Sequence, residues 1–296
     1  ASHERLEPDT SLRIHDDVRR ICVDETSYKK GHKYITVVYD MDRNRVIWIH
    51  EDHGYDVFAE FCGLLTPEER AKIEIVAGDG ASWIDSCCKD FFPKATRCID
   101  FFHVAQWINK ALDEVRIRVQ RELLEAKRTD DCAFLKNSAR LLRTAERNHE
   151  KYWAGKAERN EERIRRALSL SPDLEAAYDA YQEFHAILDV KEFSLQRLDL
   201  GDWIRKYAAS MVPEIASAAN TVRHYRGYFQ NSLKYHKSNS VAEGRNRAIK
   251  ELKRNSYGRH SFENFRKRIL MAFGPTKFQE ETYTVFGEKR DSGGRT

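Results

Sequence analysis

Five short apolar stretches precede position 100, and their β-branched and aromatic residues predict β-strands. The first three stretches are joined by short polar turns, which predicts an antiparallel meander over Ile21–Thr26, Tyr34–Asp40 and Arg45–His50. The last two, Ile73–Ala77 and Ala95–Ile99, alternate with helical patterns. Strands joined through helices pair in parallel. The pattern therefore predicts an α/β fold, a mixed five-stranded sheet flanked by helices.

From Phe101 to about Tyr225 the apolar residues follow helical spacing, which predicts a block of four to six helices. Breaks are expected near Ser171-Pro172, over Asp199–Asp202 and at Pro213. A further helix is expected from Ser238, and another over Ser261–Phe273 with Ser261 as its N-cap. The last twenty residues are expected to form a frayed tail.

The charge is unevenly distributed along the chain. The 296 residues carry a net charge of only +4, but Arg223–Arg268 holds thirteen Lys and Arg against three Glu, a net charge of +10. A segment this basic indicates a polyanionic partner. We expect DNA, and we assign the phosphate contacts to Lys29, Lys30, Lys33, Arg245, Arg247, Lys250, Lys253, Arg254 and Arg259.

None of the six cysteines forms a CxxC pair, so the sequence predicts no zinc ribbon. Several lie inside apolar runs, as small buried thiols do. With no secretory signal and no long apolar span, we expect a reduced, cytoplasmic setting and no membrane contact.

Three acidic residues are candidates for one metal site. Asp24 ends the first apolar run, Asp79 stands between two glycines after the fourth, and Glu243 opens the helix near the C-terminus. Phosphoryl transfer on DNA uses two divalent metals, and a few carboxylates hold Mg²⁺ while substrate oxygens and water complete its shell. We expect Asp24 to bridge the metals. Glu25 ranks lower, because a strand directs it to the opposite face.

Each acid also has a simpler interpretation. Asp24 can be a polar strand end, and Gly78-Asp79-Gly80 can be a plain turn. Glu243 completes a capping box with Ser240 and can simply satisfy its own helix start. Against that, Glu243 shares one helical face with a polar and basic set, Asn246, Arg247 and Lys250.

A fourth constellation is Asp100-Phe101-Phe102-His103, where Asp100 follows a strand and either caps the next helix or pairs with His103. Tryptophans are candidates for stacking on bases, although core packing is the commoner role for each of Trp107, Trp153 and Trp203.

Taken together, these motifs resemble the DDE transposases of the bacterial insertion-sequence family called ISL-three. The resemblance runs from about Ile21 to Phe273 and rests on Asp24-Glu25-Thr26, Gly78-Asp79-Gly80, Asp100 with His103, Ser238–Asn246 and Phe262–Arg266. It implies an RNase H-like catalytic domain interrupted by an all-helical insertion. It also implies that Asp24, Asp79 and Glu243 are the catalytic triad, binding two Mg²⁺ or Mn²⁺, with supporting roles for Asp100, His103, Asn239 and Asn246.

The resemblance divides the chain into a polar lead-in (1–20), the first part of the core (21–103), the helical insertion (104–232), the final core helices (233–275) and a tail (276–296). It implies cleavage of transposon ends by water, then attack of the freed 3′-hydroxyl on target DNA, with a homodimer assembled on DNA. Full-length members carry an N-terminal zinc-binding and helix-turn-helix region, which the residues before Ile21 do not match.

Two alternatives remain open at this stage. The same scaffold serves metal-dependent nucleases or resolvases that cut without joining. A domesticated transposase can also persist as a non-catalytic DNA-binding module. Strand-transfer products and metal binding at the three acids separate these functions.

Overall fold

The computed structural model describes residues 17–29, 33–235, 247–252, 254 and 261–274. The chain forms two compact units, of which unit 1 takes in Ala1–Asp100 and Lys237–Thr296, and unit 2 takes in Phe101–His236. Unit 1 is therefore built from two parts of the sequence that flank unit 2.

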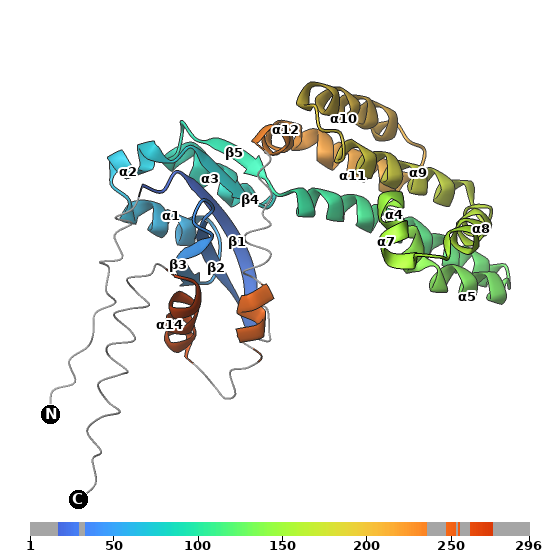
Figure 1. Cartoon of the computed structure of the whole chain (residues 1–296), viewed down its shortest axis with the longest axis horizontal. Helices are drawn as coiled ribbons and strands as arrows, with labels where there is room; N and C mark the ends of the chain where they lie inside the picture. The colour runs from blue at the N-terminus through green and yellow to red at the C-terminus, as the bar shows by residue number, and fades with distance from the viewer. Residues whose placement is uncertain (1–16, 30–32, 236–246, 253, 255–260, 275–296) are drawn as a thin grey trace, which may run out of the picture. The chain divides into compact units, whose positions relative to one another are not determined.

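Unit 1 contains one five-stranded sheet in the order β3-β2-β1-β4-β5 (Figure 1). The long β1 pairs antiparallel with β2 on one side and parallel with β4 on the other. The prediction of a mixed five-stranded sheet is confirmed. The strands are β1 (Arg20–Lys29), β2 (Lys33–Asp40), β3 (Arg45–Glu51), β4 (Ile75–Gly78) and β5 (Thr96–Ile99).

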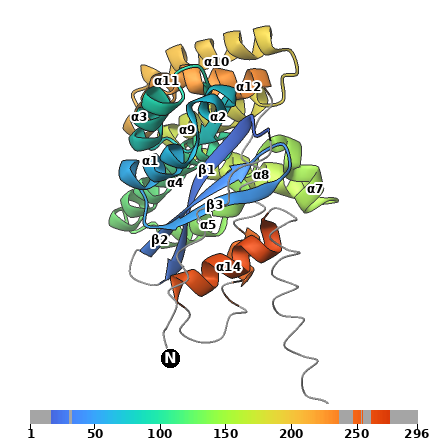
Figure 2. The same cartoon turned by 90° about the vertical axis from the view of Figure 1, so that its left-hand side faces the viewer.

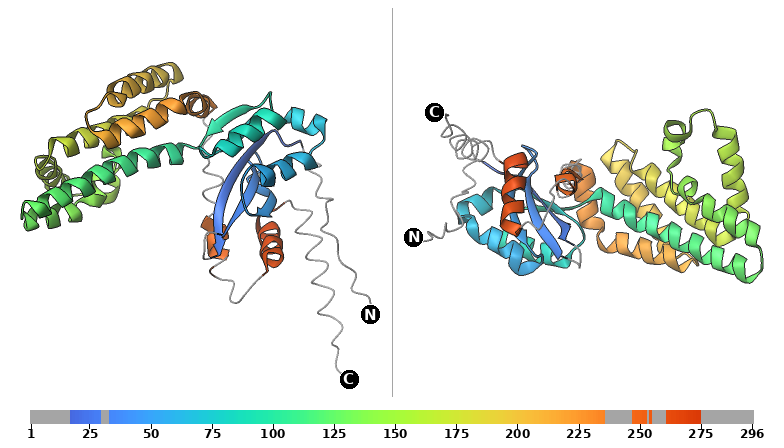
Figure 3. Two further views of the ribbon diagram at one scale, coloured as in Figure 1. Left: turned by 180° about the vertical axis from the view of Figure 1, so that it is seen from behind. Right: turned by 90° about the horizontal axis from the view of Figure 1, so that it is seen from below.

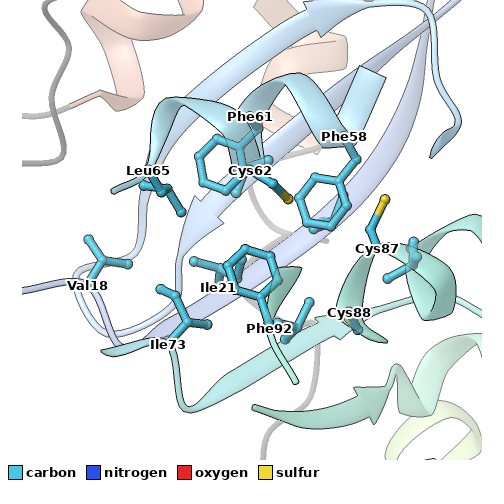
Figure 4. Packing of buried hydrophobic residues seen from close by; sticks show 14 of the residues in the cluster. Val18, Ile21, Phe58, Phe61, Cys62, Leu65, Ile73, Cys87, Cys88 and Phe92 are labelled. Carbon is cyan, nitrogen blue, oxygen red and sulfur yellow. The ribbon is translucent and has the colours of Figure 1, made fainter. Parts of the chain in front are cut away.

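One face of the sheet packs against two helices that directly follow strands in sequence, α1 (Tyr55–Leu64) and α3 (Ser82–Phe91). The short α2 (Pro67–Lys72) follows α1 and buries no residue. We call this face of the sheet the aromatic face. Ile21 of β1 lies there beside Phe58 and Phe61 of α1 and Phe92 (Figure 4). Buried thiols of Cys62, Cys87 and Cys88 fill the remaining space, and burial raises the pKa of the Cys87 thiol to about 12. These cysteines are therefore packing residues.

The opposite face, which we call the acid face, packs against segments from the other end of the chain. Cys22, Val37 and Ala77 of the sheet share one buried cluster with Ile249, in the helical residues 247–252, and with Ile269 of α14 (Phe262–Phe273). Helix α14 packs against β3 (Figure 2). The Ser261 side chain accepts a hydrogen bond from the Asn264 backbone N–H, as the predicted N-cap requires. Among the described helices, those that cover the acid face thus come from the sequence beyond unit 2.

Unit 2 is helical throughout its described residues. Its longest helix, α4, has α5, α9 and α11 packed along it (Figure 3). The helices are α4 (Phe101–Glu125), α5 (Thr129–Asn137), α6 (Ala139–Leu142), the 3₁₀ turn η1 (Glu146–Asn148), α7 (His149–Trp153), α8 (Ala157–Leu168), α9 (Pro172–Ile187), α10 (Phe193–Ala208), α11 (Pro213–His224) and α12 (Arg226–Tyr235).

The number of helices in this block was underestimated, because short helices such as α6 and α7 leave little periodic signal. The breaks at Pro172 and Pro213 are correct, since each proline stands at the start of a helix. The break expected over Asp199–Asp202 is wrong, because α10 runs through it. Gly201 sits there because a Cβ would stand 3.1 Å from the Arg226 guanidinium. Along the described part of the chain, no helix has both the length and the apolar character needed to cross a bilayer.

Candidate active site

The first two candidate acids stand at equivalent places on adjacent parallel strands. Cys22 of β1 is in register with Ala77 of β4, and Asp24 and Asp79 each follow that pair by two residues. Alternate residues of a strand share a face. Asp24 therefore belongs to the acid face, and its partner across the antiparallel ladder, Val37, lies in the buried cluster of that face.

Asp79 comes directly after β4, at the carboxyl end of the strand. The residue before it, Gly78, faces α3, because a Cβ there would lie 2.8 Å from the Ile84 side chain. Alternation then directs Asp79 to the other side, toward the acid face. Both Asp24 and Asp79 are half-buried, so each carboxylate keeps access to solvent.

Backbone N–H groups orient the two carboxylates. The Glu25 N–H donates to Asp24 Oδ1 at 2.8 Å, and the Ala81 N–H donates to Asp79 Oδ1 at 3.0 Å. The second of these bonds closes a turn that leads from β4 into α3. Carboxylates that are held in place and partly exposed suit a hard cation such as Mg²⁺, which prefers oxygen ligands.

A buried arginine supports the end of β4, and the sequence analysis missed it. Arg97 of β5 is only 6% exposed. Its Nε donates to Asp85 of α3 at 2.9 Å, and its Nη1 and Nη2 donate to the carbonyls of Gly78 and Asp79. Arg97 thus ties the Asp79 backbone to β5 and α3. A charged residue inside the otherwise apolar run before Asp100 was the available signal.

Glu25 lies apart from Asp24, as strand alternation predicts. Its Oε1 stands 3.4 Å from His53 Nδ1 on the side of the sheet that carries α1 and α3. Burial raises the pKa of the Glu25 carboxyl, the charge of Asp79 raises it further, and His53 opposes the rise. Asp79, directly after the end of β4, is therefore close enough to Glu25 for its charge to affect the pKa of that carboxyl.

The third candidate acid, Glu243, lies outside the described residues, as do Asn239, Arg245 and Asn246. The helical residues 247–252 begin four positions later. Their Ile249 is 1% exposed and packs in the cluster that contains Cys22 and Ala77. The segment that follows Glu243 therefore reaches the face that carries Asp24. Among the described residues alone, no three His, Cys, Asp or Glu side chains gather in a metal-binding group.

Some of the residues predicted to contact DNA lie within the described ranges, and others do not. Lys33, Arg247, Lys250 and Arg254 are exposed, as a phosphate contact requires. Lys29 belongs to β1, but its side chain is not described. Lys30, Lys253 and Arg259 lie outside the described residues.

Asp100 directly follows β5, and its backbone N–H donates to the Gly78 carbonyl at 3.0 Å. Its side chain is 2% exposed. His103 lies in the first turn of α4, in the other unit. The His103 ring lies edge-on to that of Phe102, with 6.1 Å between the ring centres.

The three tryptophans have different environments. Trp203 is a core residue, since it is 3% exposed and its Nε1 donates to the Ala180 carbonyl at 2.9 Å. Trp107 lines a hollow of about 450 Å³ and packs on Tyr225, while Trp153 is half-buried in α7. The core role favoured for Trp203 is therefore confirmed.

Comparison with known proteins identifies the family to which this chain belongs. The profile of a transposase family, the ISL3-type DDE transposases, matches residues 21–269. The transposase of insertion sequence IS1557 from Mycobacterium tuberculosis is 30% identical over 269 residues, covering 86% of this chain and 60% of the relative. The transposase of IS1001 from Bordetella parapertussis is 26% identical over 270 residues, covering 90% of this chain and 63% of the relative.

A shorter match of 113 residues, 33% identical, covers 38% of this chain and 34% of a Lactococcus lactis protein named an ATP-dependent protease. No solved structure matches the chain significantly. The chain spans about 60% of the length of the two transposases it matches. The profile match covers most of the sequence, from β1 into α14, so the chain belongs to the ISL3 family of DDE transposases.

Proposed function

We propose that this chain is the catalytic part of a metal-dependent DNA transposase, which cuts transposon ends and joins the freed 3′-hydroxyl to target DNA. Its catalytic residues are Asp24, Asp79 and Glu243. The observation that carries the proposal is the register of β1 with β4, which brings Asp24 and Asp79 to the same edge and face of the sheet. That face is packed by the helical segment that follows Glu243.

The proposal assigns an RNase H-like architecture to unit 1 and an insertion to unit 2. Four features support this assignment: a meander, two parallel strands, a carboxylate after β4, and a late helix returning to the same sheet. Unit 2 occupies the sequence between β5 and that returning helix. Fold resemblance alone would not establish the chemistry, which rests on the carboxylates.

The donor set fits Mg²⁺ or Mn²⁺, because the ligands are carboxylate oxygens that remain accessible to solvent. When bound, two such ions would lower the pKa of a bound water or 3′-hydroxyl and stabilise the leaving oxygen. Asp24 lies on a central strand and would be a ligand of the ions. Asp79 would hold one from the adjacent strand end, with its backbone fixed by Arg97. Glu243 would complete the set from the helix.

The exposed basic side chains of Lys33, Arg247, Lys250 and Arg254 would bind DNA phosphates near these acids. Such contacts release counterions, so binding should weaken steeply with salt. Because two transposon ends are joined to target DNA in one reaction, two active sites are needed. We therefore propose a homodimer assembled on DNA.

The test is a cleavage and joining assay on labelled duplexes that carry the element's ends, with Mg²⁺ or Mn²⁺. We expect Asp24→Asn, Asp79→Asn and Glu243→Gln each to reduce product formation at least 1,000-fold, which corresponds to roughly 4 kcal/mol of lost transition-state stabilisation. Glu25→Gln is the matched control, because this neighbouring carboxylate lies on the other side of the sheet. It should retain cleavage.

The products separate the competing functions. Cutting without joining would identify a nuclease or resolvase. DNA binding without cutting, in wild type and variants alike, would identify a binding module. If Glu243→Gln lowers the free energy of unfolding and leaves the cleavage rate intact, Glu243 serves only as a helix cap and the third ligand lies elsewhere.

A further inference from the structure

Unit 2 has a strongly uneven charge distribution. Residues 136–166 hold ten Lys and Arg against five Glu, a net charge of +5. Residues 172–208 hold four Lys and Arg against eight Asp and Glu, a net charge of −4. The first segment spans α6 to α8 and the second spans α9 and α10, so the two signs belong to different helices of the unit.

Helix α8 separates the signs on its own surface as well. It buries Asn160 and Ala167. With 3.6 residues per turn, four basic positions follow one flank of that buried line. We call these the basic stripe: Lys156, Arg159, Arg163 and Arg166, spaced i, i+3, i+7 and i+10. The same geometry directs the acidic residues of the helix to the other flank, together with Arg165: Glu158, Glu161 and Glu162.

Contacts place the stripe beside neighbouring helices. Arg163 donates to the Asn137 carbonyl at the end of α5, at 3.3 Å. Arg166 lies 4.0 Å over the ring of Phe134 in α5 and also pairs with Asp131 at 3.4 Å. The stripe thus runs along the side of α8 that adjoins α5. Helix α8 also contacts α7, and the labels of α5, α7 and α8 lie at one end of unit 2 (Figure 1).

A further cation and two aromatic rings lie next to this surface. The Arg140 guanidinium of α6 stands 5.9 Å from the centre of the Trp153 ring. The Lys156 N–H donates to the Trp153 carbonyl, which joins this pair to the start of the stripe. Tyr152 is 52% exposed and contacts Trp153. Arg140 therefore places one more cation beside the start of the stripe.

Most of these charges are not neutralised within the protein. Among the described side chains, no carboxylate lies within 4.0 Å of Arg140, Lys156, Arg159 or Arg163. Only Arg166 of the stripe has an acidic partner there, Asp131. Arg140, Lys156 and Arg159 are also exposed, whereas Arg163 is half-buried. Exposed cations without an acidic neighbour repel one another and are a natural site for a linear polyanion.

We propose that the basic stripe, together with Arg140, binds the phosphate backbone of double-stranded DNA. The inference rests on the proposed function, because it gives unit 2 a direct part in holding the DNA on which unit 1 acts. It adds a contact surface outside the basic segment around Glu243. Backbone contacts of this kind carry no sequence information, so the surface holds DNA of any sequence.

The test compares two triple variants of the 296-residue chain for binding to a fluorescently labelled duplex. One variant is Arg140→Ala, Lys156→Ala and Arg159→Ala. The matched control removes three exposed cations from the acidic part of the same unit, by Lys191→Ala, Arg197→Ala and Arg205→Ala. Anisotropy titrations over a range of NaCl concentrations give the slope of log K against log salt. Each lost phosphate contact reduces its magnitude by about 0.9.

We expect the stripe variant to reduce the slope by about 2 to 3, and the control variant to leave it near the wild-type value. Equal slopes in wild type and the stripe variant, or equal reductions in both variants, overturn the inference. Circular dichroism checks that both variants keep the wild-type helix content. An acidic protein partner in place of DNA would also show as an unchanged slope.

Metal-dependent cleavage by the same samples separates this inference from the proposed function. If the protein cleaves DNA but the stripe variant keeps the wild-type salt slope, the inference about the stripe is wrong and the proposed transposase function stands. A reduced slope in a chain that never cuts DNA supports the stripe and overturns the catalytic proposal. A wild-type chain that binds no DNA overturns both.

Discussion

The two units of this chain are built in different ways. Unit 2 comes from one continuous segment, and its helices pack along α4, which contacts α5 directly after it in sequence and α9 and α11 much farther along the same segment. Unit 1 comes from two segments separated by unit 2. Its aromatic face is closed by helices within the first hundred residues, while its acid face is closed by Ile249 and α14.

This difference between the units affects how the proposed active site is assembled. Contacts distant in sequence cost loop-closure entropy before they stabilise anything. The acid face includes such contacts, and it is the face that carries Asp24. Assembly of the proposed site therefore requires the chain on both sides of unit 2 to come together. Unit 2 also has contacts distant in sequence, such as those of α4 with α11, but all of them lie within one continuous segment.

The largest expected effect comes from cutting the chain between the units. Residues 101–236 expressed alone should give a helical domain that unfolds cooperatively in urea. Residues 17–100 alone should not, because Val37, Tyr39 and Ile35 would lose the apolar cover that Ile249 and α14 provide. Circular dichroism in urea measures both.

A matched control restores unit 1 without unit 2. Residues 17–100 joined through a short flexible linker to residues 237–274 should recover cooperative unfolding. Cooperative unfolding of residues 17–100 alone would show that the acid face is stable without Ile249 and α14. The two units would then not differ in their need for a distant segment.

Within unit 1, the aromatic face should carry the largest single-residue effect. Phe58 is fully buried, with its ring 5.8 Å from Phe61 and 5.9 Å from Trp83. Phe58→Ala should lower the free energy of unfolding by about 3–5 kcal/mol, because it removes buried surface and leaves a cavity. Leu64→Ala on the same helix is the control. Leu64 is 54% exposed, so its loss should stay within about 0.5 kcal/mol.

Much of unit 1 follows from sequence pattern, because its strands are short apolar runs bounded by turns. The mixed sheet and the α14 cap at Ser261 were predictable for that reason. The length of β1 was not, since Ser27 reads as a turn residue but pairs with Tyr34 across the ladder. Pairing with a neighbour overrode local propensity there.

The candidate site divides in the same way. The sequence was enough to single out Asp24 and Asp79, and the alternation of side chains along a strand predicts that they share a face. The role of Arg97 depends on three groups from β4 and α3, which no local pattern reveals. Likewise, Gly201 reads as a helix breaker until the position of Arg226 is known. Long-range contacts decide such positions.

A buried histidine offers a test of unit 2 alone. Burial and the charge of Arg147 lower the pKa of His185 to about 4. The unfolded chain binds the proton near pH 6.5, so acid favours unfolding. The free energy of unfolding should fall by about 2–3 kcal/mol from this residue as the pH drops from 6.5 to 4.

The measurement is urea unfolding of residues 101–236, or of the full chain, at pH 7.5 and pH 4.5. His185→Leu should reduce the pH dependence. His224→Leu should not, because His224 is exposed on α11. Equal pH dependence in wild type and His185→Leu would mean that His185 protonates in the folded protein at an ordinary pH.

The smallest effects should come from two helix caps in unit 1, and they sharpen the contrast between its faces. Thr66 accepts a hydrogen bond from the Glu69 N–H at 3.2 Å and caps α2, which buries no residue. Ser261 accepts from the Asn264 N–H at 3.3 Å and caps α14, which buries Phe265 and two more apolar side chains against the sheet. Loss of a cap costs about 0.5–2 kcal/mol.

Thr66→Ala should therefore stay local, at about 0.5 kcal/mol, and speed amide exchange only around α2. Ser261→Ala should cost about 1 kcal/mol in global unfolding, because a frayed α14 uncovers the acid face. Ser261→Asp keeps an acceptor at the cap and should restore the wild-type value. If amide exchange in β1 and β3 is unchanged by Ser261→Ala, α14 covers the acid face without stabilising it. Closure would then depend mainly on residues 247–252, which come directly after the segment that carries Glu243.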